Sequence, residues 1–154
     1  AAEKATATYH EGSVWTYAGN YDIALPCATQ NEINGEAAKR LVAQGVICVS
    51  EGANMPSDLD AIKVYKENGI FYGPAKAANA GGVAVSALEM SQNSLRLSWT
   101  REEVDGRLKD IMTNIFNTAK TTSETYGLDK DYLAGANIAA FENVANAMIA
   151  QGIV

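Results

Sequence analysis

The first half of the chain alternates short apolar runs with amphipathic segments. Three of the runs predict buried strands, at Tyr21–Leu25, Val46–Ser50 and Ile70–Tyr72. The segments between them, at about Gly35–Gln44 and Ser57–Glu67, have the spacing of helices. Strands and helices that alternate through short connections predict an α/β fold, with parallel strands joined by right-handed crossovers.

Local signals predict where these elements begin and end. Asn34 is expected to cap the first helix, and Ser57 with Asp60 forms a variant capping box for the second. Asn68-Gly69 is expected to stop the second helix. Val46–Ser50 is β-branched and almost wholly apolar, which is typical of a strand buried on both faces.

The amino-terminal stretch carries weaker signals. Ala1–Thr6 resembles the last turn of a helix whose beginning is absent, and the sequence has no initiator Met, so we expect a piece of a longer protein. Ala7–Tyr9 could form a short strand. His10–Asn20 is polar and aperiodic, which predicts a loop.

The second half predicts three long helices. The first runs from about Asn79 to Leu97, the second begins at a capping box over Thr100–Glu103 and ends at Tyr126-Gly127, and the third covers about Asp131–Ala150. The second carries an apolar stripe at helical spacing, made of Val104, Leu108, Ile111, Met112, Ile115, Phe116 and Ala119. With no repeat or linker in the sequence, we predict a single domain over residues 1–154.

Composition and charge narrow the possible functions. Hydrophobic residues make up 47% of the chain and charged residues 19%, as in ordinary globular domains. A net charge of -6 without a Lys/Arg cluster argues against nucleic acid and against an anionic membrane surface. His10, Cys27 and Cys48 do not have the spacing of a metal site or a disulfide framework. No signal sequence and no apolar run near 18 residues is present, so the cytoplasm is the expected compartment.

Three segments that follow the predicted strands are rich in small residues and carboxamides: Pro26–Asn31, Glu51–Pro56 and Gly73–Gly82. Ligands of open parallel sheets bind beyond the carboxyl ends of the strands. Small residues let a flat ligand approach the backbone, and Asn and Gln offer uncharged donors and acceptors. A nicotinamide ring, with its carboxamide and ribose, needs such partners.

Structural alternatives stand beside each of these features. Asn31, Asn54 and Asn79 could simply cap helices or turn loops, and composition alone favours that interpretation. Gly81-Gly82 at a helix start could favour an anion, with the Ser86 hydroxyl donating to a carboxylate, or could serve only close packing.

Other chemical groups are weaker candidates. We expect Cys27 to be an inert buried thiol, Cys48 to lie in the core, and Lys76 to be solvated or capping rather than catalytic. The sequence contains no GxGxxG, phosphate-binding lysine loop, GxSxG or HExxH motif.

The strand-end segments belong to longer motifs that resemble a known family. DIALPCATQNEI (22–33), EGANMP (51–56), GPAKAANAGGVAVSALEMSQNSLRLSW (73–99) and GANIAAFENVANAMIAQGIV (135–154) resemble the C-terminal third of hexameric bacterial-type glutamate dehydrogenases. The similarity covers nearly the whole chain in order.

This resemblance implies a partial Rossmann-like parallel sheet of three to four strands followed by long C-terminal helices. Residues 1–78 would be the second half of a domain that binds NADP or NAD, and residues 79–154 a helical region that returns to the interdomain hinge. The parent enzyme would be a homohexamer that interconverts L-glutamate and 2-oxoglutarate.

The motifs also imply roles for particular residues. The turn Ala28-Thr29-Gln30 is expected along the ribose and pyrophosphate of the cofactor, Asn54 at the nicotinamide ribose, and Asn79 at the nicotinamide carboxamide. Val83 and Ser86 are expected to touch the substrate, with Ser86 at the side-chain carboxylate of glutamate.

Other parts of the family pattern lie upstream of the segments matched here. They are the glycine-rich dinucleotide loop, the catalytic lysine and aspartate, the substrate-binding lysines and the residue that selects NAD or NADP. We therefore expect the 154-residue chain alone to be inactive. The alternatives are a weak nucleotide-binding module and a structural module that self-associates through an uncovered apolar face.

Overall fold

A computed structural model of the protein describes residues 8–152. The helical turn expected at Ala1–Thr6 lies outside the described residues, as does Ala7 of the expected strand. The prediction for the rest of that strand was wrong, because Thr8 and Tyr9 pair with no other strand. The loop predicted over His10–Asn20 is present and contains one 3-10 turn, η2 (Val14–Thr16).

Three short parallel strands form the sheet predicted from the apolar runs. They are β1 (Ile23–Ala24), β2 (Cys48–Ser50) and β3 (Phe71–Gly73), in the order β1-β2-β3. Ile23 is paired with Cys48, and Cys48 with Phe71, so the three strands are aligned from their first residues. The strands β1 and β2 are shorter than the runs that predicted them, and β3 begins one residue later than predicted, but the parallel α/β fold is confirmed.

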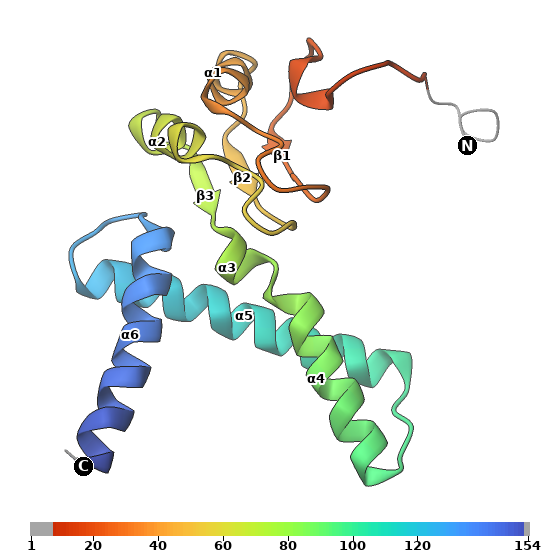
Figure 1. The fold of residues 1–154 in the computed structure, drawn as a ribbon, viewed down its shortest axis with the longest axis vertical. Coiled ribbons are helices and arrows are strands. Elements are labelled where there is room, and N and C mark those ends of the chain that lie inside the picture. The colour runs from red at the N-terminus through yellow and green to blue at the C-terminus, as the bar shows by residue number, and fades with distance from the viewer. Residues whose placement is uncertain (1–7, 153–154) are drawn as a thin grey trace.

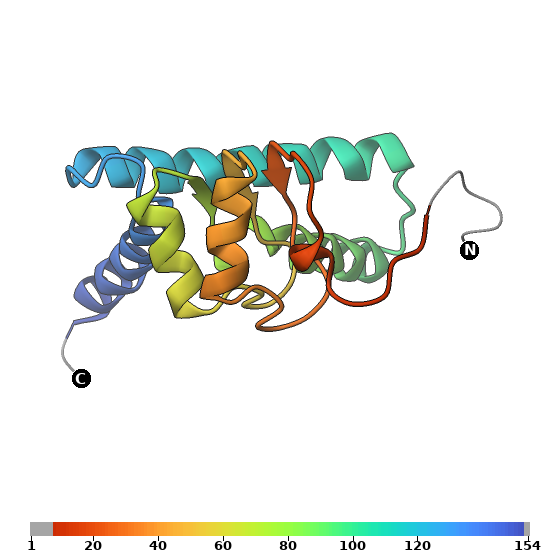
Figure 2. The same cartoon turned by 90° about the horizontal axis from the view of Figure 1, so that it is seen from above.

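Two helices connect these strands and lie next to one another on one side of the sheet, α1 (Gly35–Ala43) and α2 (Leu59–Glu67) (Figures 1 and 2). As predicted, Asn34 caps α1, since its Oδ1 accepts a hydrogen bond from the backbone N–H of Ala37 at 2.9 Å. Asn68 ends α2, and Gly69 follows with φ 67°.

The predicted cap of α2 was wrong by one residue. Asp58, not Ser57, is the N-cap, and its carboxylate accepts from the Ala61 N–H at 2.7 Å. Ser57 is buried instead, with its hydroxyl 3.2 Å from the Tyr65 hydroxyl. Aspartate is as favourable an N-cap as serine, and its use here leaves the Ser57 hydroxyl free to pair with the buried Tyr65 hydroxyl.

The core lies between the sheet and the two connecting helices. Its buried apolar residues are Ala24, Ile33, Ala37, Ala38, Leu41, Val46, Val49, Ala61, Val64, Tyr65 and Tyr72. The expectation that Val46–Ser50 is buried on both faces was wrong. Val49 points into this core, but Cys48 and Ser50 are only half-buried on the opposite face, as the alternation of a strand requires.

The carboxyl half of the chain is helical: α3 (Ala75–Ala78), α4 (Ala80–Leu95), α5 (Arg101–Thr125) and α6 (Tyr132–Gln151). The single helix predicted from about Asn79 to Leu97 is confirmed as α4, but the short helix α3 just before it was not predicted. Asn79 ends α3 and begins α4, with φ -91° and ψ 2°. Its side chain donates to groups outside both helices, and these contacts hold the chain at the break between α3 and α4.

The ends of α5 and α6 follow the predicted signals. Thr100 and Glu103 form a reciprocal capping box, Tyr126 ends α5, and Asp131 caps α6. The long α5 passes on the side of the sheet opposite α1 and α2, and α4 and α6 diverge from it (Figures 1 and 2). Within residues 8–152, no helix is long and apolar enough to span a membrane.

Candidate functional site

A shallow cleft of about 550 Å³ lies beyond the carboxyl ends of the strands. All three predicted strand-end segments contribute to it, together with the first turn of α4. The lining residues are Cys27, Ala28, Thr29, Gln30, Gly52, Ala53, Asn54, Asn79, Gly82 and Val83. Six of the seven predicted site residues therefore lie at one place, although their roles there stay predictions.

Asn54 and Asn79 are joined at the centre of this arrangement. The Asn79 Nδ2 donates to the Asn54 Oδ1 at 2.8 Å and to the Ala53 carbonyl at 3.1 Å. Because both neighbours are acceptors, the end of the Asn79 amide that faces them must be the NH₂ group. The two hydrogen bonds use both hydrogens of this group. Among the described residues, the Asn79 Oδ1 is therefore the atom left to accept a hydrogen bond from a ligand.

Asn31 does not join this pair. Its backbone has the left-handed conformation, φ 55°, which asparagine tolerates better than most residues. Its N–H donates to the Met55 carbonyl at 3.0 Å, so it ties two loops together through the backbone. The structural alternative describes Asn31 correctly.

Glu32 holds the first loop of the cleft. Its carboxylate accepts from the backbone N–H groups of Ala28 and Thr29 at 2.9 and 3.1 Å, and from the Trp15 indole N–H at 2.8 Å. Those two backbone donors are thus already used by an anion, and a phosphate beside them would meet a like charge. This weakens the expected contact with the pyrophosphate, although Thr29 and Gln30 line the cleft.

Cys27 departs from its prediction. It is exposed and lines the cleft, rather than being a buried thiol. A Cβ added to Gly52 would lie 2.5 Å from the Cys27 Sγ, so the absence of a side chain at Gly52 lets the first and second loops approach. The strand β1 ends at Ala24, so Cys27 lies in the loop beyond the sheet and not in the core.

The two glycines of the NAGG motif face different surroundings. A Cβ on Gly81 would contact Leu108 and Met112 of α5 at 3.4 and 3.5 Å, whereas a Cβ on Gly82 would meet no atom within 4 Å. Gly81 therefore lies at the packing contact, and Gly82 opens on the cleft together with Val83.

Ser86 lies one turn farther along α4, outside the lining of the cleft. Its hydroxyl donates to the Gly82 carbonyl at 3.2 Å, the usual local bond of a helical serine, and the side chain is exposed. Its expected contact with a substrate carboxylate stays a prediction.

The remaining polar candidates have structural surroundings. The exposed Lys76 donates to the Asn137 side chain at 2.6 Å and so links α3 to α6. Cys48 is half-buried, and burial raises the pKa of its thiol. Over residues 8–152, no cluster of three or more His, Cys, Asp or Glu side chains could hold a metal ion.

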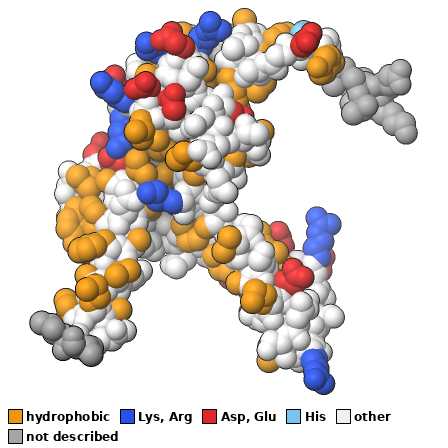
Figure 3. Space-filling model, in the orientation of Figure 1, with side chains coloured by type: hydrophobic (Ala, Val, Ile, Leu, Met, Phe, Trp, Pro, Cys, Tyr) orange, Lys and Arg blue, Asp and Glu red, His pale blue; other side chains and the backbone are white. Residues whose placement is uncertain are grey.

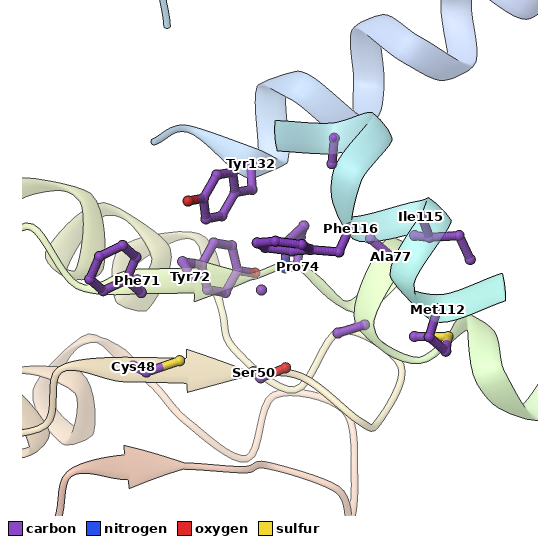
Figure 4. A pocket seen from close by; sticks show the side chains of 13 residues that line it. Cys48, Ser50, Phe71, Tyr72, Pro74, Ala77, Met112, Ile115, Phe116 and Tyr132 are labelled. Atoms are coloured by element: carbon purple, nitrogen blue, oxygen red, sulfur yellow. The ribbon is translucent and has the colours of Figure 1, made fainter. Parts of the chain in front are cut away.

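A second hollow, an apolar groove of about 460 Å³, lies between α5 and the face of the sheet that α1 and α2 do not cover (Figure 4). Cys48, Ser50 and Phe71 line it from the sheet, and the side chains of Met112, Ile115 and Phe116 line it from α5. It has no converging polar groups like the Asn54–Asn79 pair. The strand-end cleft is therefore the better candidate for a site that binds a nucleotide.

Sequence reasoning missed Glu51, the most deeply buried charged residue of the described chain. It is 2% exposed and accepts three hydrogen bonds, from Ser57, Tyr72 and Ala75. Burial, helped by this carboxylate, raises the pKa of the Tyr72 hydroxyl. A glutamate at the end of an apolar strand is the signal that could have found it, because a buried carboxylate needs donors nearby.

Comparisons with known proteins identify relatives of this chain. The chain is 55% identical to the NADP-specific glutamate dehydrogenase of Giardia intestinalis, over 95% of this chain and 33% of the relative. It is 54% identical to the glutamate dehydrogenase of Bacteroides thetaiotaomicron, over 99% of this chain and 34% of the relative. The chain thus spans about one third of the length of these relatives.

Solved structures show the same arrangement of elements. The crystal structure of Plasmodium falciparum glutamate dehydrogenase matches with a TM-score of 0.83 and 53% identity, over 86% of this chain and 29% of that one. Another glutamate dehydrogenase structure matches with a TM-score of 0.91 and 44% identity, over 99% of this chain and 34% of that one. The family model of Glutamate/Leucine/Phenylalanine/Valine dehydrogenases matches residues 1–152, and the chain belongs to this family.

Proposed function

We propose that this chain supplies the cofactor-facing part of an NAD(P)-dependent glutamate dehydrogenase. The reaction is the reversible oxidation of L-glutamate with water to 2-oxoglutarate and ammonia, with reduction of NADP or NAD. The observation that carries the proposal is the joined pair of Asn54 and Asn79 at the carboxyl ends of parallel strands. The relatives, which are named NADP-specific or NAD(P)-specific, support the choice of cofactor.

The residues of the cleft fit a nicotinamide nucleoside. Small residues at positions 28, 52, 53 and 82 leave room for a flat ring. The free Oδ1 of Asn79 is suited to accept from the carboxamide NH₂, and Asn54 from the neighbouring loop is suited to the ribose. The bound nicotinamide supplies the hydride chemistry, and this chain binds and orients it.

The same cleft supports the proposal that the chain alone is inactive. Of its ten lining residues, Cys27 is the only one with a titratable side chain. Oxidative deamination needs groups that transfer protons, and a general acid or base must reach the reacting atoms. We therefore propose that these groups, and the opposite wall of the cleft, come from the part of the relatives that this chain does not cover. The piece upstream would also complete the dinucleotide-binding domain and hold residues 79–154 at a hinge.

A hybrid enzyme tests the proposal. The chain would replace the matching third of the Bacteroides thetaiotaomicron enzyme, and reduction of NADP and NAD would be measured with L-glutamate and, for comparison, L-leucine. We expect glutamate-dependent activity in the hybrid and none in the isolated chain. In addition, Ser86→Ala should raise the KM for glutamate and leave that of the cofactor unchanged.

Two results would overturn this proposal. One is a hybrid that assembles like the Bacteroides enzyme but has no activity with glutamate. The other is turnover by the isolated 154-residue chain. The unaltered Bacteroides enzyme, prepared in parallel, is the control for the assay.

A second candidate role is self-association of the isolated chain. Apolar side chains gather over α6 (Figure 3), where Phe141, Val144, Met148 and Ile149 are 59–79% exposed. We propose that this helix is covered in a homohexameric parent and drives association when uncovered. Light scattering should show dimers or larger species of the isolated chain, and a monomer at high concentration would contradict this role. The cytoplasmic compartment stays a prediction.

A further inference from the structure

A single buried carboxylate connects the two loops that carry the asparagine pair. The Glu51 Oε1 accepts from the Ser57 N–H at 3.2 Å, and its Oε2 accepts from the Tyr72 hydroxyl at 2.7 Å and the Ala75 N–H at 2.8 Å. Glu51 itself comes directly after β2.

The positions of these donors along the chain define what the carboxylate holds. Ser57 closes the loop that begins after Glu51 and contains Asn54. Ala75 is the first residue of α3, the short turn that ends at Asn79. The two oxygens of one side chain therefore fix the end of one asparagine loop and the beginning of the segment that carries the other asparagine.

Glu51 cannot itself be a ligand of the cofactor. Its side chain is 2% exposed and does not line the cleft, whose second segment begins at Gly52. A buried carboxylate is stable only while donors surround it, so displacement of either loop would remove one of its three hydrogen bonds and raise the free energy of the folded chain. The position of Ala75 relative to Ser57 is therefore strongly restrained.

We infer that Glu51 is a positioning residue that sets the separation of Asn54 and Asn79, and through it the affinity for the nicotinamide. This inference rests on the proposed function. The hydrogen bond from the Asn79 Nδ2 to the Asn54 Oδ1 is 2.8 Å long. If one loop moved by about 1 Å relative to the other, this bond would break and the Asn79 Oδ1 would turn away from its position for the ligand.

Glu51→Gln in the hybrid enzyme tests the inference. The amide keeps the size of the side chain, but one of its ends is a donor that faces another donor. We expect the KM for NADP to rise about tenfold, as for a buried group left unsatisfied, with a smaller change in kcat. Tyr65→Phe is the matched control, because it removes a hydroxyl from the same buried region without touching the carboxylate, and should leave the KM unchanged.

A double-mutant cycle with Asn79→Ala separates positioning from general stabilisation. If Glu51 acts through Asn79, the double variant should have the same KM for NADP as Asn79→Ala alone. If the two effects multiply, Glu51 is only structural and the inference is overturned. If Asn79→Ala alone leaves the KM unchanged, the proposed role of Asn79 fails and the inference fails with it.

A second measurement covers the case in which Glu51→Gln does not fold. Tyr72→Phe removes one of the three donors and keeps the charge and both backbone bonds. It should raise the KM for NADP by less than Glu51→Gln, again with no further effect in the Asn79→Ala background. In the 154-residue chain, the side-chain amide NMR signals of Asn79 should shift on Tyr72→Phe and not on Tyr65→Phe. Unchanged Asn79 signals would overturn the inference.

Discussion

The close crossing of α5 and α6 depends on a single glycine. The direction in which its replacement changes the free energy of unfolding can therefore be predicted. Gly135 is buried in α6, and a Cβ built there would collide with the carbonyl oxygen of Ala119 and lie 3.1 Å from the Ser123 Cβ. The obstacle is backbone of α5, which cannot move aside as a flexible side chain could. Gly106, in α5, is exposed, and a Cβ there would meet no atom within 4 Å.

Two opposing terms decide the effect of Gly→Ala at these positions. Alanine is favoured over glycine inside a helix by about 1 kcal/mol, and this gain applies to both sites. Overpacking of a tight contact costs about 1 to 3 kcal/mol, and only Gly135 bears it. Its cost is expected in the upper part of this range, about 2 to 3 kcal/mol, because the obstacle is backbone. We therefore predict that Gly106→Ala stabilises the chain by about 0.5 to 1 kcal/mol and that Gly135→Ala destabilises it by about 1 to 2 kcal/mol.

Urea unfolding followed by circular dichroism measures both effects. With a slope near 2 kcal/mol/M, Gly135→Ala should lower the midpoint by roughly 0.5 to 1 M, and Gly106→Ala should raise it by up to about 0.5 M. An increase in stability with Gly135→Ala, equal to that at the control position, would refute the close approach of the two helices.

The remaining predictions concern a helix cap, an ion pair and the two thiols. Asp58→Ala should lower the free energy of unfolding by about 1 kcal/mol in the same urea assay, because α2 loses its cap. Partial burial raises the pKa of Asp131, but hydrogen bonds from Lys66 and the backbone outweigh it and lower the pKa overall. The stabilisation is therefore present above the ordinary pKa of about 3.9 and lost as the pH falls below it, and Asp131→Asn should flatten this part of the pH–stability curve. A thiol reagent at pH 8 should label the exposed Cys27 faster than Cys48, whose thiol pKa burial raises.

Each of these has a result that would count against it. An Asp58→Ala variant as stable as the parent would mean that another group caps α2. If Asp131→Asn leaves the fall in stability at low pH unchanged, the ion pair between Lys66 and Asp131 does not stabilise the fold. Equal labelling rates would contradict the difference in burial between the two cysteines.

Signals confined to a few neighbouring residues predicted much of the fold. The Asn34 cap, the Thr100–Glu103 capping box and the stops at Asn68-Gly69 and Tyr126-Gly127 all lie where the sequence placed them. These features depend on hydrogen bonds between residues three or four positions apart, which a sequence shows directly. The order of strands and helices followed from the apolar periodicity in the same way.

Features that depend on contacts distant in the sequence were missed. The choice of Asp58 over Ser57 as cap depends on the buried Tyr65, and the break at Asn79 depends on acceptors 25 and 26 residues earlier. The face of β2 that was expected to be buried is open because few side chains of this chain reach it.

The same distinction applies to the candidate site: its position was predicted, but the residues that support it were not. The strand-end rule and the motifs placed Asn54, Asn79 and Val83 in one cleft, because parallel strands bring their carboxyl ends together. Neither the rule nor the motifs indicated that Glu32 and Glu51 support the loops. Their partners lie as far as 17 and 24 residues away, and only the folded chain brings them together.

Direct recognition of the nicotinamide carboxamide by Asn79 is best tested with a cofactor analogue. In the hybrid enzyme, the KM for NADP would be compared with that for its 3-acetylpyridine analogue, which lacks the amide NH₂, before and after Asn79→Ala. We predict that the unsubstituted hybrid prefers NADP and that Asn79→Ala removes the preference, because the Asn79 Oδ1 no longer accepts from the amide. A preference that survives Asn79→Ala unchanged would contradict it.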